Sequence, residues 1–494
     1  MGMASKIIGR ENEIRILENF LASNRPEFLA IYGRRRIGKT FLIRSYFENK
    51  DVIFLNTTGA KDGPLLEQIS NFTKKIGDVF YNGAKLKAGK NWNETFEILT
   101  DAIKSKLAAD KKVVLFFDEF PWMATKNSRL LQNLDYYWNQ YWSADSKIKL
   151  IICGSSASWI KDKIVNNKGG LHNRLTQRIP LEPFDLKNTK AYLNSLGIKL
   201  NSEQILPIYM VTGGVPYYLS QIEKGFSASQ NIERLAFRRN SFLLEEFDNL
   251  FSSLFDDHEM NVEFVRAIAD SRYGIGQEEL LRKMGTALHG ESGMKKLRAL
   301  QDANFIIGFK PHFHSKKGMY YKVIDEYTLF YFHWIEPIRK TLLERGLTKG
   351  YWDKKYKSAG WDSWSGYAYE AICYKHIAQI SKALDLSPTA IPSTWRYAPK
   401  KGSKESGAQI DLLFDRDDDA ITICEIKYTD ESFSITKAYA EKFKNKIDVF
   451  NRVTRNKKQI FLVFVSANGL KDTINSEGLV DGVVTLKDLF QGVD

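Results

Sequence analysis

The chain has 494 residues, of which 43% are hydrophobic and 27% charged, so it has the composition of a globular protein with more than one core. No run of about 18 apolar residues occurs, and the N-terminal stretch MGMASKIIGRENEI has no apolar signal segment, so the sequence predicts neither a membrane span nor secretion. The net charge of +13 favours a polyanionic partner.

The positive charge is concentrated in the first half of the chain. Residues 1–255 carry a net +10, from 36 basic and 26 acidic residues, whereas residues 361–494 carry a net −1, from 18 basic and 19 acidic residues. If the protein binds nucleic acid, the first half is therefore expected to supply much of the attraction.

The three cysteines, Cys153, Cys373 and Cys424, each lie in an apolar run, and none forms a C-x-x-C pattern. Isolated cysteines of this kind are expected to be small core residues in a reducing compartment. A cytoplasmic location is the expectation that follows.

The first elements in chain order are a helix and a series of short strands. Helical spacing of Ile14, Leu17 and Phe20 predicts a helix after "IIGRENEI". Apolar runs then alternate with helical patterns, which is typical of a parallel sheet covered on both faces. These runs, each expected to be a strand, are residues 28–33, 52–56, 112–120, 148–155 and 178–184.

The sequence after residue 184 predicts four further segments. Residues 185–253 are helical throughout, and residues 256–325 read as three helices followed by two strands, the order of a winged helix. An aromatic-rich connector then leads to a second α/β region. The predicted division is 1–184 for an α/β core, 185–255 for a helical lid, 256–330 for the winged helix, 331–360 for the connector and 361–494 for the last domain.

The third predicted helix of the winged-helix segment carries Lys295, Lys296 and Arg298, as a DNA-recognition helix would. The alternative is that these residues form its solvated face and that the segment only packs against its neighbours. Its small positive charge favours packing.

"GRRRIGKT", from Gly33 to Thr40, fits the phosphate-binding pattern G-x-x-x-x-G-K-[ST] and lies between a predicted strand and a predicted helix. Its glycines let the loop curl so that backbone N–H groups point at phosphates, Lys39 would reach the β- and γ-phosphates, and Thr40 would bind Mg²⁺. The alternative, a basic turn, explains the pattern less well. The candidate nucleotide-binding residues here are Gly33, Arg34, Arg35, Arg36, Ile37, Gly38, Lys39, Thr40 and Phe41.

"VVLFFDEF" ends a second strand with two acidic residues. Asp118 is expected to hold Mg²⁺ opposite Thr40, and Glu119 to orient the attacking water. Ser155, after the fourth strand, is a candidate contact of the γ-phosphate, with a plain turn serine as the alternative. Arg174 is a candidate arginine finger for a neighbouring subunit, although a surface arginine before a strand is common.

These motifs, together with "GRENEI", "GSSASW", "NRLTQRIPLEPF" and "TGGVPYYL", resemble the prokaryotic AAA-type ATPases of the STAND-like branch. The resemblance implies ATP binding and a five-stranded sheet in which a third strand separates the strands of the two phosphate-site motifs. It also implies that Pro216, in the Gly-Gly-x-Pro segment, lies near the nucleotide. The stretch Ile8, Gly9 and Arg10 would border the adenine.

A hairpin near the C-terminus carries charged residues inside two apolar strands. With "DRDDD" (415–419) as its loop, Phe414 pairs with Ala420 and Asp411 faces Ile423. Side chains alternate along a strand, so Asp411 would share one face with Glu425 and Lys427. Unpaired charges there would cost several kcal/mol, which leaves two interpretations: an ion pair on a half-exposed hairpin, or a metal site.

The metal interpretation suits phosphodiester cleavage. Asp411, Glu425 and the carbonyl of Ile426 would bind Mg²⁺, with Mn²⁺ as an alternative ion, and Lys427 would orient water or offset charge in the transition state. Asp…Glu-x-Lys on a hairpin resembles the PD-(D/E)xK nuclease superfamily, which implies a further acidic ligand, Glu370, on the preceding helix. Ile410 stands where the superfamily usually has proline.

The expected fold class is therefore α/β: a P-loop ATPase sheet with helical lid, a winged helix and a C-terminal PD-(D/E)xK nuclease-like domain. Three functions remain open. They are an ATP-dependent or ATP-gated nuclease acting on nucleic acid, DNA before RNA, in defence or mobile-element biology; a STAND-like signalling ATPase whose last domain only binds a partner; and a motor, which is disfavoured because no helicase or pore-loop motif is evident. A homo-oligomer is compatible with each.

Overall fold

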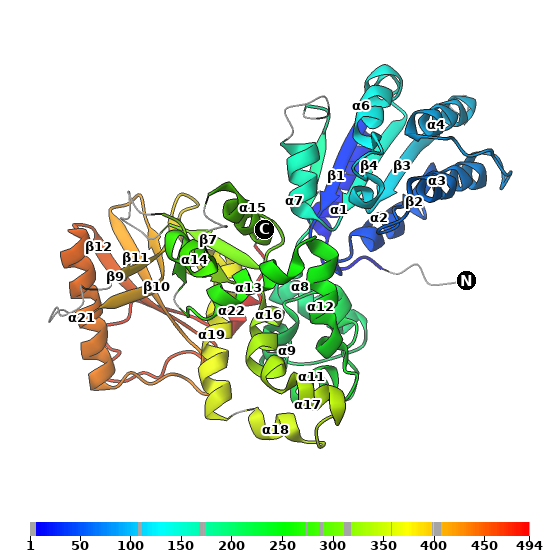
Figure 1. Ribbon diagram of the computed structural model, residues 1–494. Coiled ribbons are helices and arrows are strands. Elements are labelled where there is room, and N and C mark those ends of the chain that lie inside the picture. The colour runs from blue at the N-terminus through cyan, green and yellow to red at the C-terminus, as the bar shows by residue number, and fades with distance from the viewer. Residues whose placement is uncertain are drawn as a thin grey trace. The chain divides into compact units, whose positions relative to one another are not determined.

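The computed structural model describes residues 6–106, 111–166, 171, 173–272, 274–285, 290–310, 318–356, 358–397, 399 and 407–493 (Figure 1). The chain divides into two compact units, Met1–Pro183 with Ser253–Phe255, and Phe184–Ser252 with Asp256–Asp494. No helix in the described ranges is long and apolar enough to cross a membrane.

The first unit is built on a five-stranded parallel sheet in the order β2-β3-β4-β1-β5. Strand β4 separates β1, which leads into the phosphate-binding motif, from β3, which ends at Asp118, as the sequence predicted. The strands are β1 (Glu27–Tyr32), β2 (Val52–Thr58), β3 (Lys112–Asp118), β4 (Ile148–Gly154) and β5 (Gln177–Pro180).

Helices cover both faces of this sheet (Figure 1), because alternate residues of its buried strands point to opposite sides. Leu29 and Ile31 of β1 pack with α1 and α2, whereas Phe28 and Ala30 pack with the cluster that contains α3, α4 and α6. The helices are α1 (Glu11–Ala22), α2 (Lys39–Phe47), α3 (Leu65–Phe80), α4 (Trp92–Lys106), α5 (Phe120–Met123), α6 (Leu130–Gln140) and α7 (Ala157–Ile160).

The second unit begins with the helical segment expected as a lid, and this segment groups with the C-terminal part of the chain. Its helices are α8 (Leu186–Ser195), α9 (Ser202–Thr212), α10 (Pro216–Leu219), α11 (Ala228–Ala236) and α12 (Phe242–Leu254). The buried imidazole of His376, after α19, accepts a hydrogen bond from the backbone N–H of Leu186 at 3.1 Å. The start of α8 is thereby joined to the last domain.

Three helices and a small antiparallel sheet follow. The order is α13 (His258–Ala269), β6 (Ile275–Gly276), α14 (Gln277–Met284), α15 (Glu291–Asp302), β7 (Ile306–Phe309) and β8 (Tyr320–Val323), with the strands arranged β6-β8-β7. The aromatic connector forms α16 (Glu326–Phe330), a π-helical turn (Tyr331–Ile335), α17 (Arg339–Glu344) and α18 (Tyr351–Lys355).

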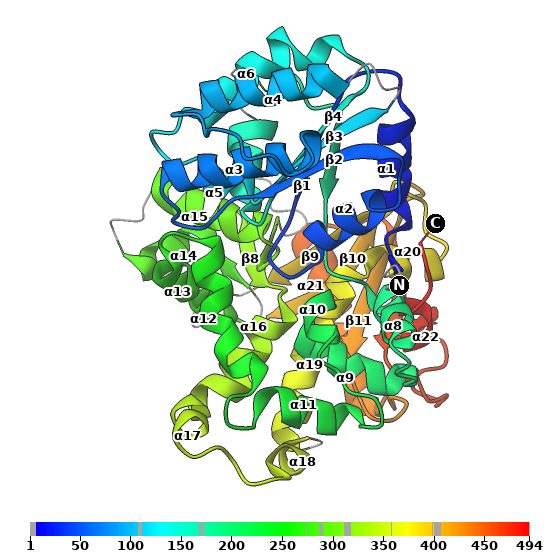
Figure 2. The same ribbon diagram turned by 90° about the vertical axis from the view of Figure 1, so that its right-hand side faces the viewer.

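The last domain has a mixed five-stranded sheet in the order β13-β12-β11-β10-β9, in which β10 is antiparallel to both neighbours and β11, β12 and β13 are parallel. Helix α19 packs against β11 (Figure 2). The elements are α19 (Ala359–Lys375), α20 (Ile377–Ala383), β9 (Ile391–Tyr397), β10 (Ala408–Asp415), β11 (Ala420–Lys427), α21 (Lys437–Thr454), β12 (Gln459–Ser466), β13 (Gly482–Val484) and α22 (Leu486–Leu489).

The register of the β10–β11 hairpin differs from the predicted one. Leu412 pairs with Cys424 and Asp415 with Ile421, so Asp411, one position beyond the ladder, is in line with Glu425 rather than Ile423. The loop is shorter than predicted because Asp415 continues the strand and the N–H of Arg416 bonds the carbonyl of Ala420 at 3.0 Å. The predicted common face of Asp411, Glu425 and Lys427 survives, since the shift is an even number of residues.

Candidate functional site

The phosphate-binding motif forms a curled loop between β1 and α2. Gly33 has φ of +149°, Arg36 has +75° and Gly38 has +91°. A Cβ on Gly33 would lie 2.2 Å from the carbonyl oxygen of Leu181, so only glycine fits there. The loop ends at the N-terminus of a nine-residue helix, where unpaired N–H groups attract anions.

Lys39 lies inside this loop with only 5% of its surface exposed. Its ammonium donates to the carbonyl oxygens of Gly33 at 2.8 Å and Arg34 at 2.9 Å, and to the hydroxyl of Ser155 at 3.2 Å. The lysine thus sits at the centre of the loop, where it can meet a phosphate.

Ser155 joins Lys39 to Glu119. Its backbone N–H donates to Glu119 Oε2 at 3.0 Å and its hydroxyl donates to Oε1 of the same carboxylate. Glu119 itself has φ of +45°, an uncommon conformation for a residue other than glycine. Such strain is often found at functional sites, where surrounding contacts hold it.

Thr40 and Asp118 meet across the loop, with the threonine hydroxyl donating to Asp118 Oδ2 at 2.9 Å. A hydroxyl and a carboxylate are oxygen ligands of the kind that Mg²⁺ prefers. The curled loop, the central lysine and this oxygen pair therefore fit a nucleotide with its Mg²⁺.

The other predicted residues lie on several elements. The guanidinium of Arg10 donates to the carbonyls of Ile37 at 3.2 Å and Glu182 at 2.8 Å, so it braces the loop from behind. Ile8 and Gly9 directly precede Arg10 in the sequence, and Phe41 is exposed on α2. Arg174 is exposed in the turn before β5. Pro216 begins α10 in the second unit.

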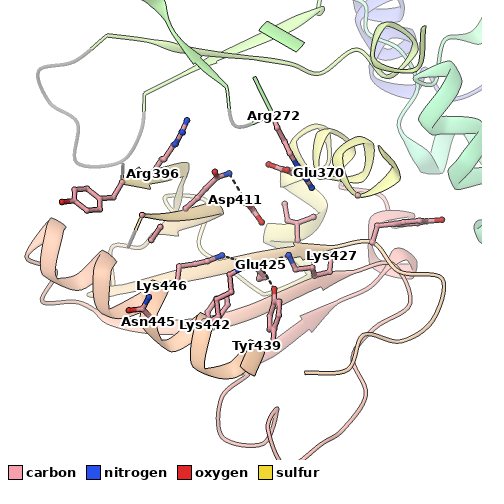
Figure 3. Close-up of a pocket in the computed structure, with 18 of the residues that line it drawn as sticks. Arg272, Glu370, Arg396, Asp411, Glu425, Lys427, Tyr439, Lys442, Asn445 and Lys446 are labelled. Carbon is pink, nitrogen blue, oxygen red and sulfur yellow. Dashed lines mark hydrogen bonds and ion pairs between the residues drawn. The ribbon is translucent and has the colours of Figure 1, made fainter. Parts of the chain in front are cut away.

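The charged residues of the C-terminal hairpin line a cavity of about 830 Å³ in the last domain (Figure 3). Strands β9, β10 and β11 form its floor, and α19 and α21 form its walls. Asp411, Glu425, Lys427 and Glu370 all line it, as the sequence predicted, together with Ile426.

Three side-chain donors contact the carboxylate of Glu425. Its Oε1 accepts from Tyr439 at 2.6 Å and pairs with Lys427 at 2.8 Å, and its Oε2 accepts from Lys446 at 2.6 Å. Burial alone would raise the pKa of Glu425, but Lys446 and Lys427 hold this pKa below its ordinary value. Glu425 is therefore ionised at neutral pH.

Asp411 has the opposite electrostatic environment. Burial, followed by the charges of Glu370 and Glu425, raises the pKa of Asp411 to about 7. Among the described residues, its Oδ1 accepts a long hydrogen bond, 3.4 Å, from Gln409 alone. A β-bulge between Ile410 and Leu413 on the side of β9 breaks the ladder at this residue, as bulges often do beside active sites.

Glu370 is in the cavity wall, but its carboxylate is already paired. It accepts from the ammonium of Lys322 in β8 and from the hydroxyl of Tyr374 at 3.2 Å. In the described part of the chain, no three His, Cys, Asp or Glu side chains are gathered closely enough to hold a metal ion. The expected set of three carboxylate ligands is therefore not assembled, because Glu370 is already paired with Lys322. The remaining candidate ligands are Asp411, Glu425 and the carbonyl of Ile426.

Several cavity residues were not singled out from the sequence. Tyr439, Lys442 and Lys446 lie on one face of α21, and their spacing of three or four residues is the signal that could have found them. Arg272 comes from the segment between α13 and β6, far away in the sequence, and no local pattern marks it.

The basic residues of the predicted recognition helix lie on α15. Lys296 donates to Asp257 at 2.6 Å, and its hydrogen bond holds the pKa of that carboxyl below its usual range. Lys296 is thus engaged within the domain itself.

Comparison with known proteins identifies the first part of the chain. Residues 7–222 match a family described as an ATPase domain predominantly from Archaea. An uncharacterised protein of Methanocaldococcus jannaschii, MJECL04, is 27% identical over 442 residues, which is 88% of this chain and 91% of that protein. An uncharacterised ATP-binding protein of the same organism, MJ0423, is 40% identical over 45 residues, 9% of this chain and 76% of that protein.

Among solved structures, the Walker-type ATPase PABY2304 of Pyrococcus abyssi is 19% identical with a TM-score of 0.43, covering 65% of this chain and 95% of that one. The ORC2 protein of Aeropyrum pernix is 14% identical with a TM-score of 0.43, covering 68% and 95%. The family match coincides with the curled loop, the central lysine and the Thr40–Asp118 pair. Residues 7–222 therefore match the archaeal-type ATPase domain, and this match supports ATP hydrolysis by this part of the chain.

Proposed function

We propose that the protein is an ATP-hydrolysing enzyme whose last domain cleaves nucleic acid, DNA being the expected substrate, with the help of Mg²⁺. One observation carries the proposal: two carboxylates with opposite pKa shifts, Asp411 and Glu425, share one cavity with Lys427. Groups with divergent pKa values in one cavity are typical of catalytic sites.

In this proposal the last domain is of the PD-(D/E)xK type and residues 256–330 form a winged helix. The order of α19, the β9–β10–β11 sheet, α21 and β12 supports the first assignment, and three helices followed by a β7–β8 hairpin support the second. The arrangement of Asp411, Glu425 and Lys427 supports a site for phosphodiester hydrolysis rather than a purely structural hairpin.

Five residues of the cavity have a role in this proposal. Asp411, Glu425 and the carbonyl of Ile426 would hold Mg²⁺ or Mn²⁺, hard ions that take oxygen ligands. A bound ion of this kind lowers the pKa of water and neutralises charge on a phosphoryl oxygen. Lys427 positions the water and stabilises the negative charge of the transition state. Glu370 can join the ligands only after Lys322 leaves it.

The ATPase residues have parallel roles. Lys39 binds the phosphates, Thr40 and Asp118 hold Mg²⁺, and Glu119 orients the attacking water while Ser155 fixes its carboxylate. The Ile8–Arg10 stretch and Phe41 would border the nucleotide, and Arg174 of a second copy would act as the arginine finger in a homo-oligomer.

The test is a cleavage assay on the full chain with Mg²⁺ or Mn²⁺, on single- and double-stranded DNA and on RNA, with and without ATP. Asp411→Ala and Glu425→Ala should abolish cleavage and divalent-ion binding in the cavity, while ATP hydrolysis at the phosphate loop continues. Lys427→Ala should retain the ion and lose cleavage, because an ammonium is not a metal ligand. Asp448→Ala, an exposed carboxylate on α21 outside the cavity, is the matched control. No metal-dependent cleavage of any substrate by the unaltered protein would refute the proposal.

A second candidate is a STAND-like regulator whose last domain binds a partner and cuts nothing. The saturation of Glu425 by Lys427, Lys446 and Tyr439 favours it, since these donors already satisfy the carboxylate. This candidate predicts destabilisation of Glu425→Ala, which leaves two half-buried ammonium groups without their carboxylate, and no effect of divalent ions on the melting temperature of the unaltered protein.

A further inference from the structure

Gly366 lies in the middle of α19 and faces the cavity. Glycine destabilises the interior of a helix, so a packing reason is normally expected for it there. A Cβ added at Gly366 would meet no atom within 4 Å among the described residues. Packing against the described residues therefore does not require this glycine, and none of their atoms fills the space beside it.

The same face of α19 carries Asp362, Ser363 and Glu370, which also line the cavity. Each of these residues is three or four positions from Gly366 in the sequence, so together they form one stripe along the helix. At Gly366 the wall of the cavity is bare backbone, and a bulky molecule can approach α19 closely.

Cations lie on two sides of the acidic centre. In Figure 3, Asp411 lies between Arg272 and Arg396 above it and Lys442 and Lys446 below it. Arg272 and Lys442 are exposed, and neither forms an ion pair with any residue in the described ranges. Lys446, in contrast, is engaged by Glu425. The two cations without an ion pair among the described residues, Arg272 and Lys442, therefore lie on opposite sides of Asp411, where the cleaved phosphate would bind.

We propose that this cavity is a groove for a polynucleotide strand, in which Gly366 lets the sugar–phosphate backbone pass along α19 and Arg272 and Lys442 bind phosphates on the two sides of the cleaved one. The inference rests on the proposed nuclease function and adds the path of its substrate. A single small anion would need one cation, whereas cations on opposite sides of a cavity of about 830 Å³ suit a polymer with repeated charges. Because Arg272 belongs to the segment between α13 and β6, the site is shared between the last domain and the domain before it.

Thiol labelling of the full chain tests the path of the strand without requiring cleavage. The three native cysteines are buried, so a maleimide added to a Gly366→Cys variant reports on the introduced thiol. Single-stranded DNA, duplex DNA and single-stranded RNA are added in turn, without divalent ions. Lys444→Cys is the matched control, because Lys444 is exposed on α21 and does not line the cavity.

At least one of the three nucleic acids should slow labelling of the Gly366→Cys variant and leave that of Lys444→Cys unchanged. Adding Arg272→Ala should weaken the protection and lower the slope of log affinity against log salt concentration by about 0.7 for a single strand or about 0.9 for a duplex. Lys442→Ala should do the same. Equal labelling with and without all three nucleic acids, or protection that Arg272→Ala leaves unchanged, would overturn the groove.

The two proposals fail in different ways. Cleavage that depends on Asp411 and Glu425, without protection at residue 366, would leave the nuclease standing and reject this path for the strand. Protection at residue 366 without metal-dependent cleavage would support the groove and reject the nuclease. Gly366→Ala supplies an independent readout: it should raise the melting temperature, since nothing opposes a Cβ there, yet raise the KM of cleavage.

Discussion

The ammonium of Lys322, in β8, donates a hydrogen bond to the carboxylate of Glu370, in α19, and both side chains are more than 90% buried. The pair joins the small three-stranded sheet to the wall of the acidic cavity, across 48 positions of sequence. Lys322 also lies 4.8 Å from the centre of the Tyr374 ring, whose hydroxyl bonds Glu370 and the carbonyl of Asp411. Through the Tyr374 hydroxyl, the ion pair of Glu370 with Lys322 is thus linked to β10, the strand that carries Asp411.

Removing only one partner of the Lys322–Glu370 pair should destabilise the protein. Lys322→Met leaves Glu370 as an uncompensated buried charge, so we expect a loss of about 3–5 kcal/mol in the free energy of unfolding. Glu370→Gln in the same chain should recover much of the loss, because no charge is then stranded. Denaturant unfolding of the two single variants and the double variant measures this coupling. Additive losses in the double variant would contradict a direct pair.

The ATPase site gives a separate prediction. Lys39→Ala should weaken ATP binding by an order of magnitude or more, because the buried ammonium at the centre of the loop contacts the phosphates. Glu119→Gln should keep ATP binding and lose hydrolysis, since the carboxylate acts only on water. Isothermal titration and phosphate release measure the two effects, with the exposed Lys126→Ala as control. Hydrolysis at the unaltered rate by Glu119→Gln would refute the role assigned to this residue.

The phosphate-binding loop could be predicted from the sequence because its geometry is local. Gly33 and Gly38 occupy backbone conformations that only the motif's glycines adopt easily, and the strand and helix on either side follow from hydrophobic periodicity. The sheet order then follows from the family resemblance. Strand β9 was not predicted. Its Pro392 is tolerated because β9 is at the edge of the sheet.

The C-terminal site was only partly predictable. The period-2 alternation of strands placed Asp411, Glu425 and Lys427 on one face even though the loop length, and with it the register, was wrong by two residues. The pairing of Glu370 with Lys322, and the contribution of Arg272, depend on contacts between elements that are far apart in the sequence. No periodicity within one element carries that information.

His376 gives a pH-dependent prediction for the second unit. Burial of its ring lowers the pKa of His376 to about 4, although the hydrogen bond to the carbonyl of Ile372 opposes this shift. The neutral ring accepts a hydrogen bond from the N–H of Leu186. Its pKa in the unfolded chain is about 6.5, so the unfolded state binds a proton first as the pH falls. Stability should be fully present above about pH 6.5 and be lost progressively toward about pH 4.

Thermal melts between about pH 7 and about pH 4 measure this loss, and His376→Gln should remove much of the pH dependence, at the expense of stability at neutral pH. The half-buried His258, at the start of α13, is the control: His258→Gln should leave the slope unchanged. A pH dependence that is the same in His376→Gln and in the unaltered protein would show that other groups are responsible.

Asp411 shows the reverse behaviour, because burial and the neighbouring carboxylates Glu370 and Glu425 raise its pKa to about 7, above the ordinary value of about 3.9 in the unfolded chain. Between these two values the folded protein keeps a proton that the unfolded chain has released. The contribution of Asp411 to stability should therefore fall as the pH rises from about 4 to about 7, and its full cost should be present above that.

Asp411→Asn removes the charge and keeps the shape, so its melting temperature relative to the unaltered protein should be higher at about pH 8 than at about pH 5. Mg²⁺ needs the ionised carboxylate, so binding releases a proton and the affinity of the unaltered protein should rise up to about pH 7 and then level off. Saturating Mg²⁺ should accordingly stabilise the unaltered protein more at the higher pH and leave Asp411→Asn unaffected. Asp448→Asn, outside the cavity, should match the unaltered protein throughout. If Mg²⁺ raised the melting temperature of Asp411→Asn as much as that of the unaltered protein, the ion would not be bound by Asp411, and the raised pKa would belong to a carboxyl that serves only the packing of the hairpin.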